Sequence, residues 1–335
     1  MSAFGATILD PTDLYLQPEE KALFRAVNPY GFILFARNID TPDQVRRLCG
    51  DLRDSVGREA PILVDQEGGR VQRLRGTQWR DWMAPLDFVQ RAQSAAPRAL
   101  YLMYRLIAAE LSEVGIDTNC APLVDIAGHG THAFLRDRCY GDTAGTVARL
   151  GRAVADGLLH GGVLPVVKHI PGHGRATMDT HYDLPHVSAS REDLMATDFA
   201  PFRTLNDLPL GMTAHLVFDA WDDAPATWSD TMVQVIREEI GFHGLLMSDD
   251  LAMEALEGGH VARAQRALAA GCDALLYCNQ PLADRAAVAE AAGTMTPAAQ
   301  TRAEKALAWR KTPEDIDIPA LESELEALLG GAADG

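Results

Sequence analysis

Short apolar runs alternate with longer amphipathic stretches along the whole chain. The runs are rich in Val, Ile and Leu and too short for helices, which is typical of parallel strands buried on both faces. Eight of them predict strands, at Gly5 to Leu9, Gly31 to Phe35, Pro61 to Val64, Asp117 to Cys120, Leu164 to Val167, Leu210 to Thr213, Gly244 to Met247 and Ala274 to Tyr277.

The amphipathic stretches between these runs predict helices. Several begin at a residue suited to cap a helix, such as Thr41 before Pro and Asp, or Ser190 before Arg, Glu and Asp. The clearest helices are expected at Thr41 to Val56, Pro97 to Val114, Thr143 to Leu159, Arg191 to Leu205, Asp230 to Glu239, Ala262 to Gly271 and Leu282 to Ala292.

About eight strand–helix units in one chain predict an α/β fold, a single (β/α)8 TIM-type barrel. A doubly wound parallel sheet is the alternative. No Pro/Gly/Ser-rich linker divides the sequence, so we expect residues 1–335 to form one catalytic barrel domain. The Ala/Glu-rich tail from about residue 297 predicts one or two outer helices.

Polar residues follow several of the predicted strands. In a barrel, the loops after the strands meet at one rim, where catalytic groups lie. Each residue alone could be a cap or a turn, but their coincidence in five units predicts a site at that rim. The residues are Asp65 to Arg70, Lys168 and His169, His215, Ser248 to Asp250, and Asn279.

The loop from Lys168 to His181 is rich in Gly and His. Within it, Asp179 and His181 are two residues apart, so in an extended segment both side chains face the same side. The carboxylate can then orient the imidazole and leave its other nitrogen for substrate. A metal site formed by His169, His173 and His181 is an alternative, although the loop lacks a common zinc-binding spacing. His173 could equally hold the loop in shape.

Two adjacent acids, Asp249 and Asp250, end another predicted strand. Adjacent strand residues point to opposite faces, so only one of the two can face a given pocket. We expect Asp249 to carry out the chemistry and the Asp250 carboxylate to cap a helix N-terminus or support the site.

Composition narrows the possible partners and the compartment. The 47 acidic and 30 basic side chains give a formal net charge of -17, which argues against a nucleic-acid partner. No apolar run approaches the length of a membrane helix, and the N-terminus does not resemble a signal peptide. Five scattered cysteines, an odd number without a CxxC pair, fit a reducing compartment. We therefore expect a cytoplasmic protein without a membrane partner.

Four strings together resemble glycoside hydrolase family 3, and more narrowly its single-domain bacterial β-N-acetylhexosaminidases. They are Asp65-Gln-Glu-Gly-Gly-Arg70, Lys168-His-Ile-Pro-Gly-His-Gly174, Asp179-Thr-His181 and Ser248-Asp-Asp-Leu-Ala-Met253. Gly31-Phe-Ile-Leu-Phe-Ala-Arg-Asn38 and Arg138-Cys-Tyr-Gly141 are similar to further landmarks of that group.

The resemblance implies a role for each matching residue. Asp249 corresponds to the nucleophile, His181 to the general acid/base and Asp179 to its partner. Substrate hydroxyls would be held by the residues Asp65, Arg70, Arg138, Lys168 and His169. The implied activity is retaining release of terminal N-acetylglucosamine from β-glycosides, with peptidoglycan fragments as the expected substrates in cell-wall recycling. No cofactor or metal is implied. We expect a monomer that binds a small carbohydrate or muropeptide.

Three other functions are compatible with the sequence or need to be weighed against it. A metal-dependent barrel hydrolase would use the loop histidines as ligands. A sugar-binding protein without turnover would lack Asp249 or His181, and both are present. Finally, an Asp–His pair lacks an anionic acid/base that would repel inorganic phosphate, so phosphorolysis could compete with hydrolysis.

Overall fold

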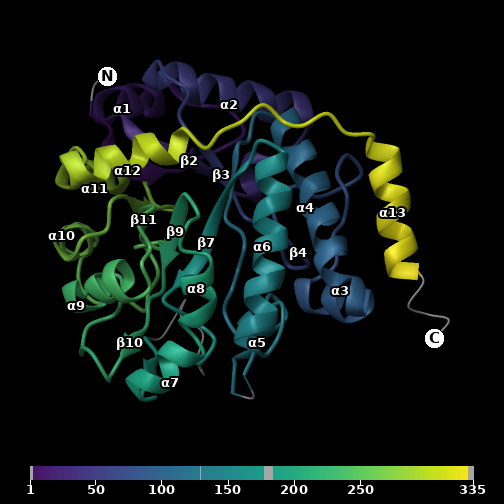
Figure 1. Ribbon diagram of the computed structural model, residues 1–335. Helices are drawn as coiled ribbons and strands as arrows, with labels where there is room; N and C mark the ends of the chain where they lie inside the picture. Colours follow the sequence, from purple (N-terminus) through teal and green to yellow (C-terminus); the bar gives the residue numbers. More distant parts are fainter. Residues whose placement is uncertain (1–2, 129, 177–183, 331–335) are drawn as a thin grey trace.

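The computed structural model describes residues 3–128, 130–176 and 184–330, and it has a parallel eight-stranded barrel at its centre (Figure 1). Neighbouring strands pair in chain order, and a parallel bridge between Met247 and Ala274 links the two ends of the sheet. The fold is therefore a nearly closed TIM-type barrel, and not a doubly wound sheet. The barrel strands are β1 (Gly5–Leu9), β2 (Pro29–Leu34), β3 (Ile62–Val64), β6 (Thr118–Asn119), β7 (Leu164–Ile170), β9 (Leu210–Thr213), β11 (Leu245–Met247) and β12 (Leu275–Tyr277).

Every residue of these strands is buried, as expected for strands with side chains in the barrel interior on one face and under helices on the other. All eight predicted strands are confirmed, with small shifts at their ends. Two pairs of short strands lie outside the barrel: β4 (Gln66–Gly68) with β5 (Val71–Gln72), and β8 (His186–Val187) with β10 (Val217–Phe218).

Helices cover the outside of the barrel. Thr41, for example, accepts a hydrogen bond from the Gln44 backbone and is followed by Pro42 in the first turn. The helices are α1 (Pro18–Val27), α2 (Pro42–Val56), α3 (Pro85–Ala92), α4 (Ala96–Glu113), α5 (Ala133–Arg136), α6 (Ala144–His160), α7 (Arg191–Ala196), α8 (Ala200–Thr204), α9 (Asp230–Gln234), α10 (His260–Ala270), α11 (Leu282–Ala292), α12 (Pro297–Leu307) and α13 (Ile318–Gly330). Two 3-10 helices, η1 (Ala36–Asn38) and η2 (Gln93–Ala95), and a π-helix, η3 (Val235–Glu239), are also present.

The single helix expected at Arg191 to Leu205 is wrong, because the chain forms α7 and α8 with a break at Thr197. Pro201 cannot donate the backbone hydrogen bond that a continuous helix would require at that point. The Asp198 carboxylate in the break accepts a hydrogen bond from Arg175. This hydrogen bond therefore joins the segment between α7 and α8 to the loop that follows β7.

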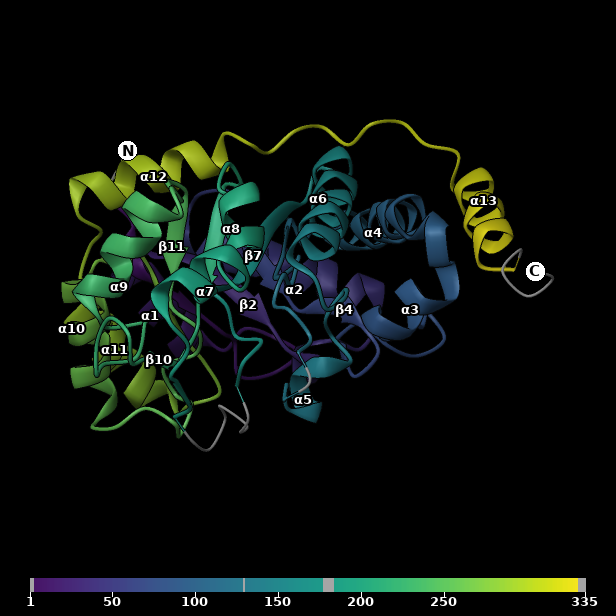
Figure 2. The same ribbon diagram turned by 60° about the horizontal axis from the view of Figure 1, so that its bottom comes forward.

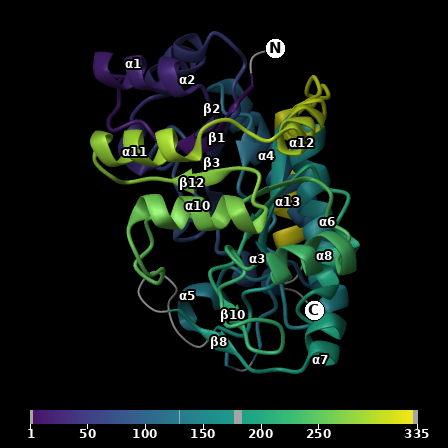
Figure 3. The same cartoon turned by 90° about the vertical axis from the view of Figure 1, so that its left-hand side faces the viewer.

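The C-terminal segment spans the end of the barrel opposite the strand-end loops. Figures 1 and 2 show an extended stretch of chain that leads from α12 to α13. Helix α13 packs on α3 and α4. Figure 3 shows α10 and α11 side by side on another part of the outer wall. Arg302 pairs with Asp273 at 2.6 Å, and Arg310 pairs with Asp117 at 2.9 Å. The outer helices predicted from about residue 297 are thus confirmed, and ion pairs hold this segment to the strand starts.

No helix within the three described ranges is both long enough and apolar enough to cross a bilayer. All five cysteines are free and buried. This agrees with their scattered positions and the lack of a CxxC pair in the sequence.

Candidate active site

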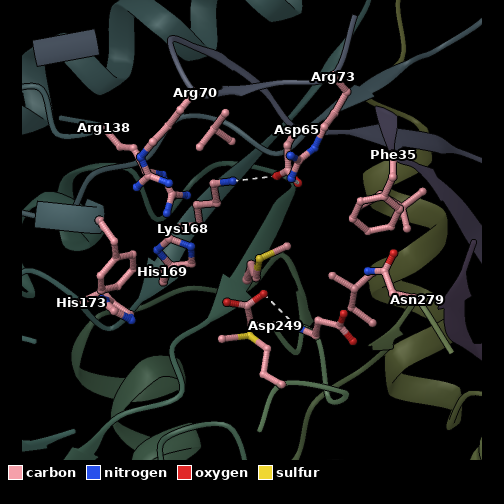
Figure 4. A pocket seen from close by; sticks show the side chains of 17 residues that line it. Phe35, Asp65, Arg70, Arg73, Arg138, Lys168, His169, His173, Asp249 and Asn279 are labelled. Atoms are coloured by element: carbon pink, nitrogen blue, oxygen red, sulfur yellow. Dashed lines mark hydrogen bonds and ion pairs between the residues drawn. The ribbon is translucent and has the colours of Figure 1, made fainter. Parts of the chain in front are cut away.

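A cavity of about 400 Å³ opens at the carboxyl ends of the barrel strands (Figure 4). The residues that line it come from loops after several different strands, since parallel strands direct all their ends to one rim. Six residues with an expected catalytic or substrate-binding role line this cavity together: Asp65, Arg70, Arg138, Lys168, His169 and Asp249. His173, Asp250 and Asn279, which the sequence also placed near the rim, line it as well.

A buried network of opposite charges forms one wall of the cavity. The Lys168 ammonium contacts Asp65 at 2.9 Å and Glu67 at 2.7 Å. Arg138 donates two hydrogen bonds, of 2.9 and 2.8 Å, to the Glu67 carboxylate. Arg73 donates one of 2.9 Å to Asp65. The polar side chains are therefore fixed before any ligand arrives.

The charges in this wall determine the protonation of its members. Burial alone would raise the pKa of Asp65, but the Lys168 ammonium and Arg73 guanidinium outweigh it and hold that pKa well below its usual range. Burial would likewise raise the pKa of Glu67, yet Arg138 and Lys168 lower it to about 2. Both carboxylates stay ionised at neutral pH, and so do the cations that face them.

His169 is oriented by Asp125, a residue not identified from the sequence. The Asp125 carboxylate, which is fully buried, lies 2.7 Å from His169 Nδ1 and accepts a 2.6 Å hydrogen bond from the His173 backbone. A carboxylate can only accept, so His169 carries its proton on Nδ1 and leaves Nε2 for a ligand. Burial and the neighbouring His169 lower the pKa of His173 to about 3, so that ring is neutral.

The glycines of the loop after β7 allow it to pack against the loop after β6. A Cβ atom on Gly174 would lie 2.1 Å from the Ile126 carbonyl oxygen. Only glycine permits this approach. The Pro-Gly-His-Gly string therefore brings His173 within reach of Asp125.

Asp249 and Asp250 differ in protonation. Burial would raise the pKa of Asp249, but His169, His215 and the Asp250 amide lower it below its usual range. That amide donates a 2.8 Å hydrogen bond to Asp249. Asp250 instead accepts hydrogen bonds from the backbone of Ala252 and Cys278, and burial together with the Asp249 charge raises its pKa to about 7. Asp249 is thus ionised at neutral pH, and Asp250 ties two loops together.

His215 supports the same segment from the strand beside it. Its Nε2 lies 3.1 Å from the Asp250 carbonyl oxygen, and its Nδ1 lies 2.7 Å from the Thr227 hydroxyl. The carbonyl requires Nε2 to be the donor, and burial lowers the pKa of this ring. His215 therefore holds the backbone next to Asp249 in place.

The remaining sequence-based candidates lie at the rim or beyond the described residues. Arg70 is half-exposed and pairs with Asp137 at 3.1 Å, with its side chain beside the cavity (Figure 4). Asp179 and His181 lie outside the described residues. Among the residues that are described, no group of three His, Cys, Asp or Glu side chains could hold a metal ion. The metal hypothesis includes His181, which lies outside the described residues, so it stays a hypothesis.

Glu67 and Asp125 also have signals in the sequence. Glu67 belongs to the Asp-Gln-Glu-Gly-Gly string, in which only the first acid received a role. Asp125 ends an apolar run that continues past the predicted strand, and Leu123 in that run forms a bridge with Lys168.

Comparison with known proteins identifies relatives of this chain. The profile of the Glycosyl hydrolase family 3 N terminal domain matches residues 14–307. The chain is 38% identical over 283 residues to a beta-hexosaminidase of Tolumonas auensis, covering 82% of this chain and 83% of that protein. It is 40% identical over 276 residues to a beta-hexosaminidase of Alkalilimnicola ehrlichii, covering 79% and 78%.

Among solved structures, native NagZ from Neisseria gonorrhoeae superposes with a TM-score of 0.84 at 30% identity, covering 99% of both chains. The same Neisseria protein has also been solved in complex with zinc ion. The match to the family profile, the barrel and the full-length relatives lead to one conclusion: this chain is a glycoside hydrolase that belongs to glycosyl hydrolase family 3.

Proposed function

We propose that this protein is a retaining exo-β-N-acetylglucosaminidase that releases terminal N-acetylglucosamine from β-glycosides. Asp249 acts as nucleophile, His181 as general acid/base and Asp179 as the partner of that histidine. Asp65, Arg70, Arg138, Lys168 and His169 hold the sugar.

One observation carries the proposal: an ionised carboxylate, Asp249, lies in a cavity across from a fixed cluster of donors and acceptors. In Figure 4 Asp249 lies below Lys168 and Asp65. The space between them suits a pyranose with its anomeric carbon above the carboxylate. The names of the relatives, beta-hexosaminidase and NagZ, support an N-acetylhexosamine as that sugar.

In the first step an Asp249 oxygen bonds to the anomeric carbon, and the bond from that carbon to the leaving oxygen breaks. His181, protonated, gives its proton to the departing oxygen. The product is a covalent glycosyl-enzyme of inverted configuration. In the second step a water oxygen attacks the same carbon while His181 takes the water proton, and Asp249 departs as carboxylate. Two inversions restore the original configuration.

Other residues act by charge and orientation. The bonds from Lys168 to Asp65 and Glu67 keep the ammonium protonated and fixed, so Lys168 can donate to a sugar hydroxyl and does not serve as a base. His169 presents Nε2 because Asp125 holds its other nitrogen. Such fixed groups lower the cost of ordering the substrate.

The expected biological substrates are peptidoglycan fragments in cell-wall recycling, in the cytoplasm. This part of the proposal is carried over from the family resemblance. We also propose that the protein is a monomer that binds a small carbohydrate or muropeptide and has no nucleic-acid or membrane partner.

The experiment compares chromophore release from an aryl N-acetyl-β-glucosaminide and from the matching β-glucoside. We expect a kcat/KM higher by at least about a hundredfold for the first, because a pocket that bonds an acetamido group is left with unpaired donors by a hydroxyl analogue. Comparable values for the two substrates would contradict the proposal. Adding inorganic phosphate distinguishes the phosphorolytic alternative, since that reaction releases the sugar 1-phosphate in place of the free sugar.

A further inference from the structure

Asn279 lies on the wall of the cavity, two residues after the end of β12, and its side chain is exposed. Its backbone has a φ of 60°, in the left-handed region that asparagine tolerates better than most residues. The backbone amide donates a 3.0 Å hydrogen bond to Asp10. Strand β1, which precedes Asp10, thus fixes the position of Asn279.

The orientation of the Asn279 amide is set by Arg37. The Arg37 guanidinium donates hydrogen bonds to Asn279 Oδ1 and to the buried Asp10 carboxylate. A guanidinium has no acceptor, so the oxygen of the amide must face it. The amide nitrogen must then face the other way, and Figure 4 shows it directed toward the cavity. Within the described ranges, Nδ2 donates to no protein acceptor. Asn279 therefore offers the cavity a donor.

Phe35 forms the wall beside this donor. The guanidinium carbons of Arg37 and Arg73 lie 5.0 and 5.6 Å from the centroid of its ring. These two contacts restrict the ring. The wall thus combines one apolar face with one fixed donor. Arg138 and His169 lie on the opposite side of the cavity (Figure 4).

The two sides fit the two edges of a pyranose. If the anomeric carbon lies above Asp249 and the far hydroxyls lie at Asp65, one edge carries the acetamido group and a hydroxyl. The other edge carries the C5 hydroxymethyl group and the ring oxygen. The side with Arg138 and His169 is rich in polar groups and suits the first edge. An aromatic face with one donor suits a methylene that bears a hydroxyl.

We infer that Asn279 is a specificity-determining residue whose Nδ2 donates a hydrogen bond to the C6 oxygen of the sugar. The assignment rests on the proposed function, because it requires a hexose with its anomeric carbon at Asp249. The same inference assigns a function to the Gly-Phe-Ile-Leu-Phe-Ala-Arg-Asn string at 31–38. Its Phe35 and Arg37 form and orient this wall.

The test measures kcat/KM for 4-nitrophenyl N-acetyl-β-glucosaminide and for its 6-deoxy analogue. Asn279→Gly removes the side chain and still accepts a positive φ, whereas alanine would strain the backbone. We expect about a tenfold loss on the parent substrate, the usual effect of deleting one neutral hydrogen bond. On the 6-deoxy substrate the same variant should match the wild type within about twofold. Asn279→Asp retains the shape but loses the donor, and it should also lose about tenfold or more on the parent.

Asn28→Asp is the matched control. Asn28 also has a positive φ, of 45°, and its Oδ1 accepts a 3.0 Å hydrogen bond from Arg58, but it lies at the start of β2, away from the cavity. Its kinetics should equal those of the wild type. An Asn279→Gly enzyme that is fully active, or that loses the same factor on both substrates, overturns the inference while wild-type turnover leaves the proposed function standing. If Asn279→Gly does not fold, full activity of Asn279→Asp overturns it equally. A wild type that cleaves neither substrate overturns both.

Discussion

Glu67 offers a stability prediction whose size follows from its ion pairs. Glu67→Gln retains the volume of the side chain but removes the charge that Arg138 and Lys168 share. The new amide nitrogen would also face a donor of Arg138. A pKa of about 2, against 4.5 for an ordinary glutamate, corresponds to about 3 kcal/mol at roughly 1.36 kcal/mol per pH unit. This agrees with the ~3–5 kcal/mol expected when one partner of a buried pair is removed.

The pH dependence of this effect has a definite sign. The pKa of Glu67 is lower in the folded state, so its contribution is fully present above about pH 4.5 and is lost as the pH falls toward 2. The stability difference between wild type and Glu67→Gln should therefore be about 3 kcal/mol at pH 7 and should shrink steadily below about pH 4.5.

The assay is urea unfolding at several pH values, together with thermal unfolding at pH 7. With an unfolding entropy of about 2.1 cal/mol/K per residue, 3 kcal/mol lowers the Tm of a 335-residue chain by about 4 °C. Glu326→Gln, an exposed position on α13, serves as control and should leave the Tm within about 1 °C. A difference below about 1 kcal/mol at pH 7, or one that stays constant down to pH 3, would refute the reasoning.

Further predictions concern the chemistry. Asp249→Ala should be inactive with every leaving group, whereas His181→Ala should show a burst equal to the enzyme concentration with a dinitrophenyl glycoside, because that group departs without a proton. The absence of a burst and of a trapped sugar adduct in His181→Ala would show that this histidine is not the acid/base. Asp179→Ala should show the behaviour expected of His181→Ala in a milder form. Activity should survive dialysis against a strong chelator, and loss with recovery on adding zinc would favour the metal-dependent alternative. Asp125→Asn should lower kcat/KM by about tenfold or more without unfolding the protein, because the amide no longer selects the Nδ1–H form of His169; an unchanged kcat/KM would show that Asp125 is not needed to orient the ring.

Local features of the chain determined most of the fold. Short apolar runs rich in branched residues form buried strands wherever they pair, and the helices between them follow from caps and from the 3.6-residue period. The pattern does not show the break at Thr197, because the helical period continues across 191–205, although Pro201 within that stretch is a known breaker.

The sequence also brought Asp65, Lys168, His169 and Asp249 to one rim, since the ends of parallel strands must meet there. Order along the chain is enough for that inference. The order of the two acids along the chain is the only reason the sequence offers for choosing Asp249 over Asp250. The pKa of Asp249 is lowered and that of Asp250 is raised, and both shifts depend on burial and on neighbouring groups that no local pattern contains.

Only the tertiary structure decided which side chains hold the others. Glu67 meets Arg138 across 71 residues, Asp125 meets His169 across 44, and Arg37 meets Asn279 across 242. Such pairs depend on how neighbouring loops pack and on how close two backbones approach, as Gly174 does to Ile126. A single sequence carries residue types and spacing, but ion pairs and fixed amide orientations arise from distances between segments that come together only when the barrel closes.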